Sequence, residues 1–124
     1  MSATPAPTVL VVDDDAFVVA VLRDLLEDQG AHVVEARDGD EALAVAERER
    51  PALIFLDLVM PNRSGLEALP ELLRRSPGAR VLVVSSLDAK ALVDEARRLG
   101  AVGYIAKPFH PAEIAQAVRD QLPG

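Results

Sequence analysis

Five polar side chains each stand directly after a short apolar run, and their types suit the chemistry of phosphate. Asp13 and Asp14 follow the first such run in the chain, Asp57 the third, Ser85 the fourth and Lys107 the fifth. Such runs indicate strands that are buried on both faces of a parallel sheet. Because ligands bind at the carboxyl ends of the strands in open α/β sheets, we expect these five side chains to form one site.

This set of side chains predicts a metal-assisted phosphoryl site. Three carboxylates within a few ångströms resist ionising together unless a divalent cation compensates their charge. Mg²⁺ fits best, because the site offers oxygen ligands and neither histidine nor cysteine. Lys107 would supply a point charge and Ser85 a hydroxyl donor for a phosphoryl group. We favour Asp57 as the nucleophile that forms an aspartyl phosphate, since it stands alone on a central strand with the acidic pair opposite.

The elements that must hold this site alternate between strand and helix. Segments with apolar residues at helical spacing separate the apolar runs, and Gly30 and Gly100 stand where helix C-terminal caps belong. Asp38 and Ser64, each followed three residues later by a glutamate, predict helix starts. Pro70 is expected to interrupt the third helix and to bend it or shorten its regular part, because proline lacks a backbone donor. The strands are predicted at residues 9–12, 32–36, 53–56, 81–84 and 103–106.

Strands that alternate with helices in this way predict an α/β fold, with right-handed crossovers and a parallel sheet covered on both faces. The 124 residues suffice for one domain, which we place at residues 9–122 after a disordered lead at residues 1–8. We expect no output domain. The glycine-rich turn of a dinucleotide-binding fold is missing after the first strand, where the chain has three aspartates instead.

The composition narrows the classes of partner. A net charge of −7, with no basic run longer than a pair, disfavours direct binding to nucleic acid. The apolar runs are far shorter than the ~20 residues of a transmembrane helix, and the absence of cysteine fits a reducing compartment. We therefore expect a cytoplasmic protein that binds neither membrane nor nucleic acid.

The segments VVDDD, LIFLDLVMPNRSG, VLVVSS and GYIAKPF occur in an order and spacing that resemble the receiver domain of two-component response regulators. The likeness runs from Val9 to Leu122 and is greatest to single-domain, chemotaxis-type regulators. It implies the flavodoxin-like (βα)5 fold, three layers with a parallel sheet of strand order 2-1-3-4-5. It also implies a signalling switch rather than an enzyme, phosphorylated by a histidine kinase or phosphotransfer protein and acting on a downstream protein as a monomer or a phosphorylation-dependent dimer.

The resemblance also assigns roles to individual residues. Asp57 would be the phosphoacceptor, and Asp13 and Asp14 would hold Mg²⁺ together with Asp57 and the backbone carbonyl of Val59. Ser85 would be the switch hydroxyl and Lys107 the phosphate contact. The remaining features are the switch aromatic Tyr104 and a peptide bond between Lys107 and Pro108 that is typically cis.

Three positions depart from the family pattern. Val59 and Leu87 are apolar where relatives often carry polar side chains, so neither can orient a water molecule toward the phosphoryl group. This predicts an aspartyl phosphate that is long-lived for the family. His110 occupies a helix cap position where an acidic or small polar residue is commoner.

Two alternative functions are compatible with the acidic cluster. The first is a small Mg²⁺-dependent aspartyl phosphatase or phosphotransferase of the haloacid dehalogenase type, although Val59 stands where such enzymes have a second aspartate. The second is a degenerate receiver that acts as an unphosphorylated interaction module. Degenerate receivers usually lose an acidic residue or the lysine, and this chain keeps all of them.

A partner-docking surface is predicted on the first helix. Helical spacing with Val18 and Leu22 turned inward, together with Val21 and Leu25, leaves the outward face near the acidic pocket small and apolar. The predicted docking residues are Ala16, Phe17, Val19 and Ala20.

Overall fold

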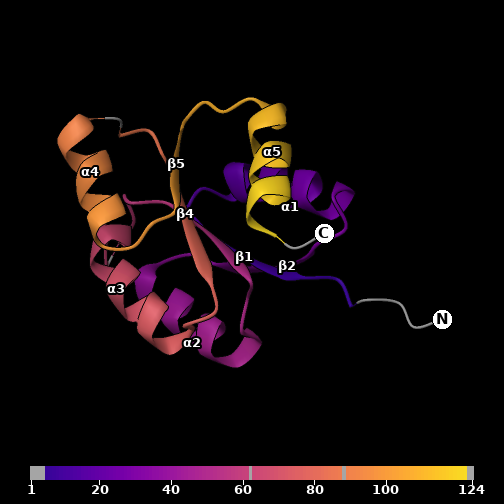
Figure 1. Ribbon diagram of the computed structural model, residues 1–124, viewed down its shortest axis with the longest axis horizontal. Helices are drawn as coiled ribbons and strands as arrows, with labels where there is room; N and C mark the ends of the chain where they lie inside the picture. Colours follow the sequence, from indigo (N-terminus) through magenta and orange to yellow (C-terminus); the bar gives the residue numbers. More distant parts are fainter. Residues whose placement is uncertain (1–4, 62, 88, 123–124) are drawn as a thin grey trace.

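The structure, a computed structural model, describes residues 5–61, 63–87 and 89–122. Within these residues the chain forms a parallel sheet flanked by helices (Figure 1). The strand order is β2-β1-β3-β4-β5, which confirms the predicted flavodoxin-like fold. The strands are β1 (Thr8–Val12), β2 (His32–Ala36), β3 (Leu53–Leu56), β4 (Arg80–Ser85) and β5 (Gly103–Ala106). The helices are α1 (Ala16–Asp28), α2 (Gly39–Glu49), α3 (Gly65–Arg75), α4 (Lys90–Arg98) and α5 (Pro111–Gln121).

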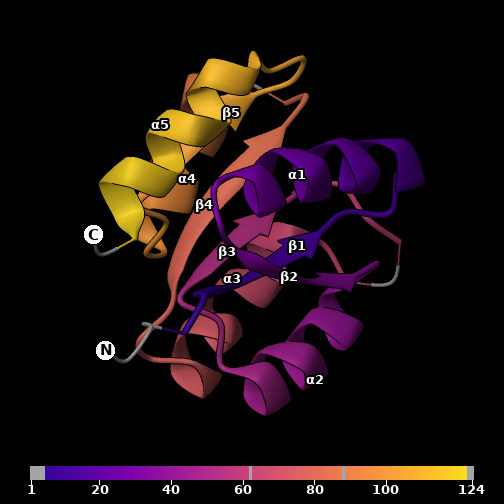
Figure 2. The ribbon, with the colours of Figure 1, turned by 90° about the vertical axis from the view of Figure 1, so that its right-hand side faces the viewer.

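Helices cover both faces of the sheet, which gives three layers (Figures 1 and 2). Strand side chains alternate between the two faces, so Leu10 and Ile54 pack under α2, α3 and α4, while Val9 and Phe55 pack under α1 and α5. Every residue of β3 is buried. The continuous apolar run that ends at Asp57 is therefore a central strand with a core on each side.

Capping side chains stand at the starts of α1, α2, α3 and α5, each of which follows the carboxyl end of the preceding strand. Asp15, directly after the acidic pair, accepts the backbone N–H of Phe17 at 2.9 Å and caps α1. Asp38 and Ser64 cap α2 and α3 as predicted, each accepting the N–H of the residue three positions later. His110 caps α5, because its Nδ1 accepts the Ala112 N–H at 3.1 Å. These caps fix the loops that surround the site.

Gly65 lets the start of α3 lie directly against the phosphoacceptor candidate. A Cβ at this position would stand 2.0 Å from the carbonyl oxygen of Asp57. The Gly65 N–H donates to the carbonyl of Leu58 at 3.1 Å, which ties the first turn of α3 to the residue after Asp57. Only glycine allows the helix to approach the loop so closely.

Pro70 does not interrupt the third helix, contrary to the prediction. Helix α3 runs from Gly65 to Arg75 with Pro70 inside it. Proline removes one backbone hydrogen bond, but Ala68, Leu69 and Leu72 on the same helix are fully buried. The packing of this face offsets the lost bond.

The predicted lead at residues 1–8 is shorter than expected. Thr8 belongs to β1, and the carbonyl of Pro7 accepts the His32 N–H at 2.8 Å. These two residues extend the sheet, because their backbone groups pair with neighbouring segments. Residues 1–4 lie outside the described residues. In the described part of the chain, no helix combines the length and apolar character needed to cross a membrane.

Candidate functional site

The carboxyl edge of the sheet brings together the three aspartates that the sequence pattern singled out. Asp13, Asp14 and Asp57 each offer one carboxylate oxygen, and these oxygens lie within 4.8 Å of one another. Asp13 and Asp57 are buried, at 2% and 6% exposure, whereas Asp14 is exposed. All three groups are carboxylates, the oxygen donors that Mg²⁺ prefers, so the chemistry of this set fits that ion.

Lys107 lies between the two buried carboxylates. Its Nζ is 2.7 Å from Asp13 Oδ2 and 3.6 Å from Asp57 Oδ2. Burial, the largest single effect, lowers the pKa of Lys107, but the hydrogen bond and charge of Asp13, together with the charge of Asp57, outweigh it and leave that pKa above its ordinary value. The lysine therefore stays cationic, and its ammonium can stabilise additional negative charge at Asp57.

Asp57 has a raised pKa in the absence of a metal ion. Burial is the main cause, and the negative charge of Asp13 adds to it. Lys107 and the backbone N–H groups of Val59 and Leu58 lower the pKa of Asp57 without cancelling these effects. An additional cation beside Asp57 would offset the repulsion from Asp13.

Ser85 stands at the same edge and is fully buried. Its Oγ accepts the N–H of Leu87 at 3.2 Å, and the Leu87 carbonyl accepts a hydrogen bond from the Tyr104 hydroxyl. The backbone of Leu87 thus connects the serine to the aromatic residue on β5. Tyr104 itself is half-buried and packs against the core under α4.

Two apolar side chains flank the acidic cluster at the surface. Val59 is 54% exposed and Leu87 43% exposed, so neither is taken up by the core. The Val59 N–H lies 3.4 Å from Asp57 Oδ1, which keeps this part of the loop close to the carboxylate. The role of the Val59 carbonyl as a metal ligand stays a prediction.

On α1, the structure corrects one predicted docking residue. Ala16 and Ala20 are exposed and Phe17 is 75% exposed, but Val19 is only 8% exposed and packs in the core beneath α1 and α5. Val19 therefore cannot belong to a docking face. The first turns of this helix are apolar on nearly every side, so spacing alone does not determine which side turns inward.

Two hollows adjoin the site on either side of α1. Ala16 and Ala20 line one of about 220 Å³ together with Asp13 and Asp14. The other, of about 410 Å³, is mainly apolar and lies between Phe17, Val18 and Val21 on α1 and the segment from Lys107 to Phe109. Sequence reasoning missed this second groove, because only the fold brings residues 107–109 beside α1. The Lys107–Pro108 peptide bond is cis, as the resemblance implied.

Comparisons with known proteins agree with this geometry. A family model described as the response regulator receiver domain matches residues 9–119. The chemotaxis protein CheY of Thermotoga maritima is 35% identical, over 89% of this chain and 92% of that protein. The crystal structure of the CheX-CheY-BeF3-Mg²⁺ complex from Borrelia burgdorferi gives a TM-score of 0.88 at 29% identity, covering 94% of this chain and 90% of that chain.

A further solved structure bears on the chemistry of the family. It is a response regulator protein from Burkholderia pseudomallei with a phosphorylated aspartic acid, calcium ion and citrate. Its TM-score is 0.84 at 35% identity, with 90% of this chain and 65% of that chain covered. The fold, the acidic edge and these likenesses agree, and the chain belongs to the response regulator receiver domain family.

Proposed function

We propose that this chain accepts a phosphoryl group on Asp57 from the phosphohistidine of a histidine kinase or phosphotransfer protein, with Mg²⁺ as cofactor. The observation that carries the proposal is the position of the Lys107 ammonium between Asp13 and Asp57 at the edge where three carboxylates converge. The arrangement supports phosphoryl transfer because it surrounds one buried nucleophile with groups that neutralise added negative charge.

In the transfer step, an Asp57 carboxylate oxygen attacks phosphorus, an O–P bond forms and the P–N bond to the donor imidazole breaks. The imidazole leaves with the bonding electron pair and takes up a proton. When bound, Mg²⁺ would be held by Asp13, Asp14, Asp57 and the Val59 carbonyl, and it would neutralise charge on the phosphoryl oxygens. Lys107, whose Nζ is 3.6 Å from Asp57 Oδ2, supplies a second positive charge.

Ser85 is proposed to bind the phosphoryl group on Asp57 and so to couple phosphorylation to other parts of the molecule. A serine hydroxyl donates one hydrogen bond and accepts others, so Ser85 can donate to a phosphoryl oxygen while it interacts with Leu87. A shift of Ser85 toward Asp57 would pull on Leu87 and so on its contact with Tyr104. In this proposal, phosphorylation changes the surface formed by α4, β5 and α5.

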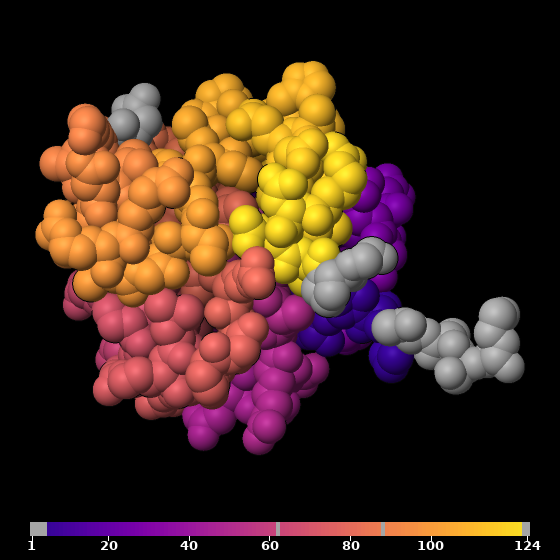
Figure 3. Space-filling model, in the orientation of Figure 1, coloured from indigo at the N-terminus to yellow at the C-terminus, as the bar shows by residue number. Residues whose placement is uncertain are grey.

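That surface offers a groove for a downstream protein. A hollow lies over β5 between α4 and α5 (Figure 3). Its volume is about 470 Å³, and Tyr104 and the exposed Val102 are among the residues that line it. Arg97 stands on its α4 side and Glu113 and Asp120 on its α5 side, so the two walls differ in charge. The groove suits a protein partner or a second receiver after phosphorylation.

The upstream partner is proposed to bind beside α1. A donor histidine must reach Asp57, and both hollows next to α1 adjoin residues of the acidic site. Phe17 and the segment Pro108–Phe109 provide apolar area that a partner helix can cover, while the exposed Ala16 and Ala20 allow close approach.

Acetyl phosphate labelling with Mg²⁺ tests the proposed function. The unaltered chain should take up one acid-stable, base-labile phosphoryl group, and chelation of the metal should abolish the uptake. Asp57→Asn should take up none. Asp24→Asn, which makes the same chemical change at an exposed position on α1, should behave like the unaltered chain. Normal uptake by Asp57→Asn would contradict the assignment.

A further inference from the structure

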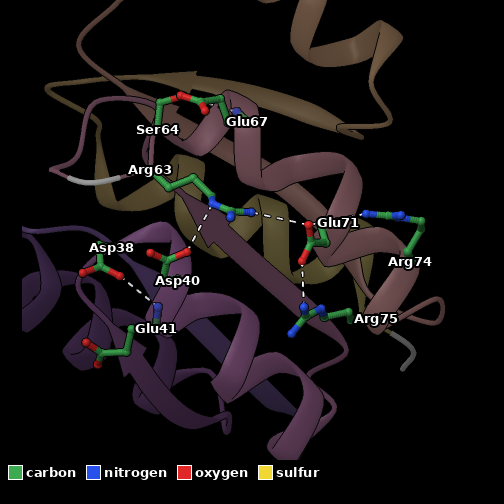
Figure 4. Close-up of polar contacts among 9 residues, drawn as sticks. All are labelled: Asp38, Asp40, Glu41, Arg63, Ser64, Glu67, Glu71, Arg74 and Arg75. Carbon is green, nitrogen blue, oxygen red and sulfur yellow. Dashed lines mark hydrogen bonds and ion pairs between the residues drawn. The ribbon is translucent and has the colours of Figure 1, made fainter.

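Arg63 lies in the loop between β3 and α3, six residues after the phosphoacceptor, and reaches two helices at once. Its Nε is 3.2 Å from Asp40 Oδ1 in the first turn of α2, and its Nη1 is 3.4 Å from Glu71 Oε1 on α3 (Figure 4). Because one guanidinium spans both contacts, the loop is fastened to the two helices that flank it.

These contacts belong to a network rather than to isolated pairs. The Glu71 carboxylate also forms ion pairs with Arg75, at 2.8 Å, and with Arg74, at 3.4 Å. Arg75 forms a further ion pair with Glu47 on α2, at 3.2 Å. The Arg63 side chain is only 35% exposed. Networked, partly buried ion pairs restrain geometry more than single exposed pairs do.

The backbone of Arg63 also packs against the start of α2. A Cβ placed on Gly39, the first residue of α2, would be 2.9 Å from both the Arg63 carbonyl oxygen and the Arg63 Cβ. The end of the loop therefore packs against the start of α2 with no space between them. This contact does not depend on charge.

The loop that Arg63 holds directly follows the phosphoacceptor candidate Asp57 and contains Val59. Its first part is fixed by the buried Leu58, whose carbonyl accepts the Gly65 N–H. Val59 follows and is largely exposed, so its own side chain contributes little to holding it in place. Arg63 supplies an anchor on the far side of Val59.

We propose that Arg63 is a positioning residue, which holds the loop after Asp57 in the conformation that directs the Val59 carbonyl toward the metal ion. The inference rests on the proposed function, because it concerns Mg²⁺ at the same site. The clamp keeps the loop ordered before the ion arrives, so binding the ion requires less ordering of the chain.

The test compares Arg63→Gln with Arg74→Gln. Both variants remove one positive charge and one contact to Glu71, but only the first releases the loop. In metal-free protein, amide hydrogen exchange at described residues of the loop, Leu58 to Ser64, should be faster in Arg63→Gln and unchanged in Arg74→Gln. Amide shifts during a Mg²⁺ titration should give a dissociation constant about fivefold higher for Arg63→Gln only, equivalent to ~1 kcal/mol.

Labelling by acetyl phosphate separates positioning from damage to the site. At saturating Mg²⁺, Arg63→Gln should be labelled at nearly the normal rate, because the reacting groups are intact. Gly39→Ala, which displaces the Arg63 backbone without a change in charge, should weaken Mg²⁺ binding in the same direction.

Two results would overturn the clamp: equal weakening of Mg²⁺ binding in Arg63→Gln and Arg74→Gln, or no weakening in Arg63→Gln. If the unaltered chain fails to bind Mg²⁺ or to be labelled, the proposed function fails instead. In that case the exchange rates of the metal-free variants still decide whether Arg63 orders the loop.

Discussion

At the scale of single residues, the burial of Asp57 lowers the stability of the metal-free native state once its carboxyl group is ionised. The carboxylate is buried next to a second buried carboxylate, and its pKa lies above the ordinary value of 3.8. Between that ordinary value and the raised one, the native state retains a proton that the unfolded chain has released. The stabilising contribution of Asp57 is therefore present at low pH and is lost as the pH rises through the raised pKa.

Asp57→Asn should consequently stabilise the metal-free protein at neutral pH. Because the pKa of Asp57 is raised in the native state, the unaltered chain loses stability as the pH rises, so Asp57→Asn should have the larger free energy of unfolding at pH 7. The gain should shrink as the pH falls toward 4. Urea unfolding in the presence of a chelator, across this pH range, measures it.

Asp24→Asn serves as the control, because it makes the same chemical change at an exposed position on α1. A difference between Asp57→Asn and the unaltered chain that stays constant with pH would contradict the expectation. Added Mg²⁺ should narrow the difference at pH 7, since the ion binds the unaltered native state.

Val59 leads to a prediction about the lifetime of the phosphoryl group. Its apolar, exposed side chain cannot orient a water molecule at Asp57, whereas an amide could. Val59→Asn should speed dephosphorylation about tenfold, the effect of ~1.4 kcal/mol in the barrier. The measurement is loss of radiolabel after removal of acetyl phosphate.

Val102→Asn makes the same change at another exposed valine, which directly precedes β5 at the end of the strand opposite to Lys107, and should leave the decay unchanged. Equal or slower decay in Val59→Asn would show that the polarity of this side chain does not control hydrolysis.

At the scale of elements, α1 carries the prediction about the upstream partner. Ala20→Glu should slow phosphotransfer from a cognate kinase by about tenfold or more, as the loss of ~1.4 kcal/mol of docking energy would. Labelling by acetyl phosphate should not change, because Ala20 is not one of the residues proposed to hold the metal ion or to contact the phosphoryl group. The fastest donor in a panel of purified histidine kinases provides the assay.

The matched control for Ala20→Glu is Ala44→Glu, which introduces the same charge at an exposed position on α2. Equal loss with both phosphoryl donors would mean that Ala20→Glu damages the pocket. No loss with either donor would place the docking surface away from α1.

The strands and the acidic cluster were predictable because their signals are local. A short unbroken apolar run favours a strand buried on both faces, and parallel strand ends meet at one edge of the sheet. The pattern alone therefore predicted that Asp13 and Asp57 lie together. The burial of Val19 was not predictable, since apolar residues surround the first turns of α1. Spacing determines a buried face only when the opposite face is polar.

Other features depend on tertiary contacts that leave no sequence pattern. Arg63 looks like an ordinary loop residue until the fold brings Asp40 and Glu71 beside it. The predicted interruption at Pro70 was wrong, because the buried side of α3 stabilises the helix beyond what local rules count. His110 stood at a recognised cap position, but only the structure gives it the Ala112 N–H as a partner.

At the scale of the whole molecule, the contacts from Ser85 through Leu87 to Tyr104 link the acidic edge to the α4, β5 and α5 surface. Phosphorylation should therefore shift amide resonances on this surface as well as near Asp57. In Ser85→Ala, which removes only a buried hydroxyl, labelling should persist but the distant shifts should be lost. Shifts confined to the Asp57 loop in the unaltered chain would refute the coupling.

The hydrogen bond between Lys107 and Asp13 joins residues 94 positions apart in the chain. Lys107 is held at the edge by β5, since its backbone N–H donates to the Ser85 carbonyl at 2.9 Å. During synthesis the aspartates emerge first, and until β5 pairs with β4 they lack this internal cation. A copy truncated before Lys107, by incomplete synthesis or by proteolysis, would lack this cation. Under the proposed function, such a copy would not be phosphorylated and would not compete with intact copies for phosphoryl groups.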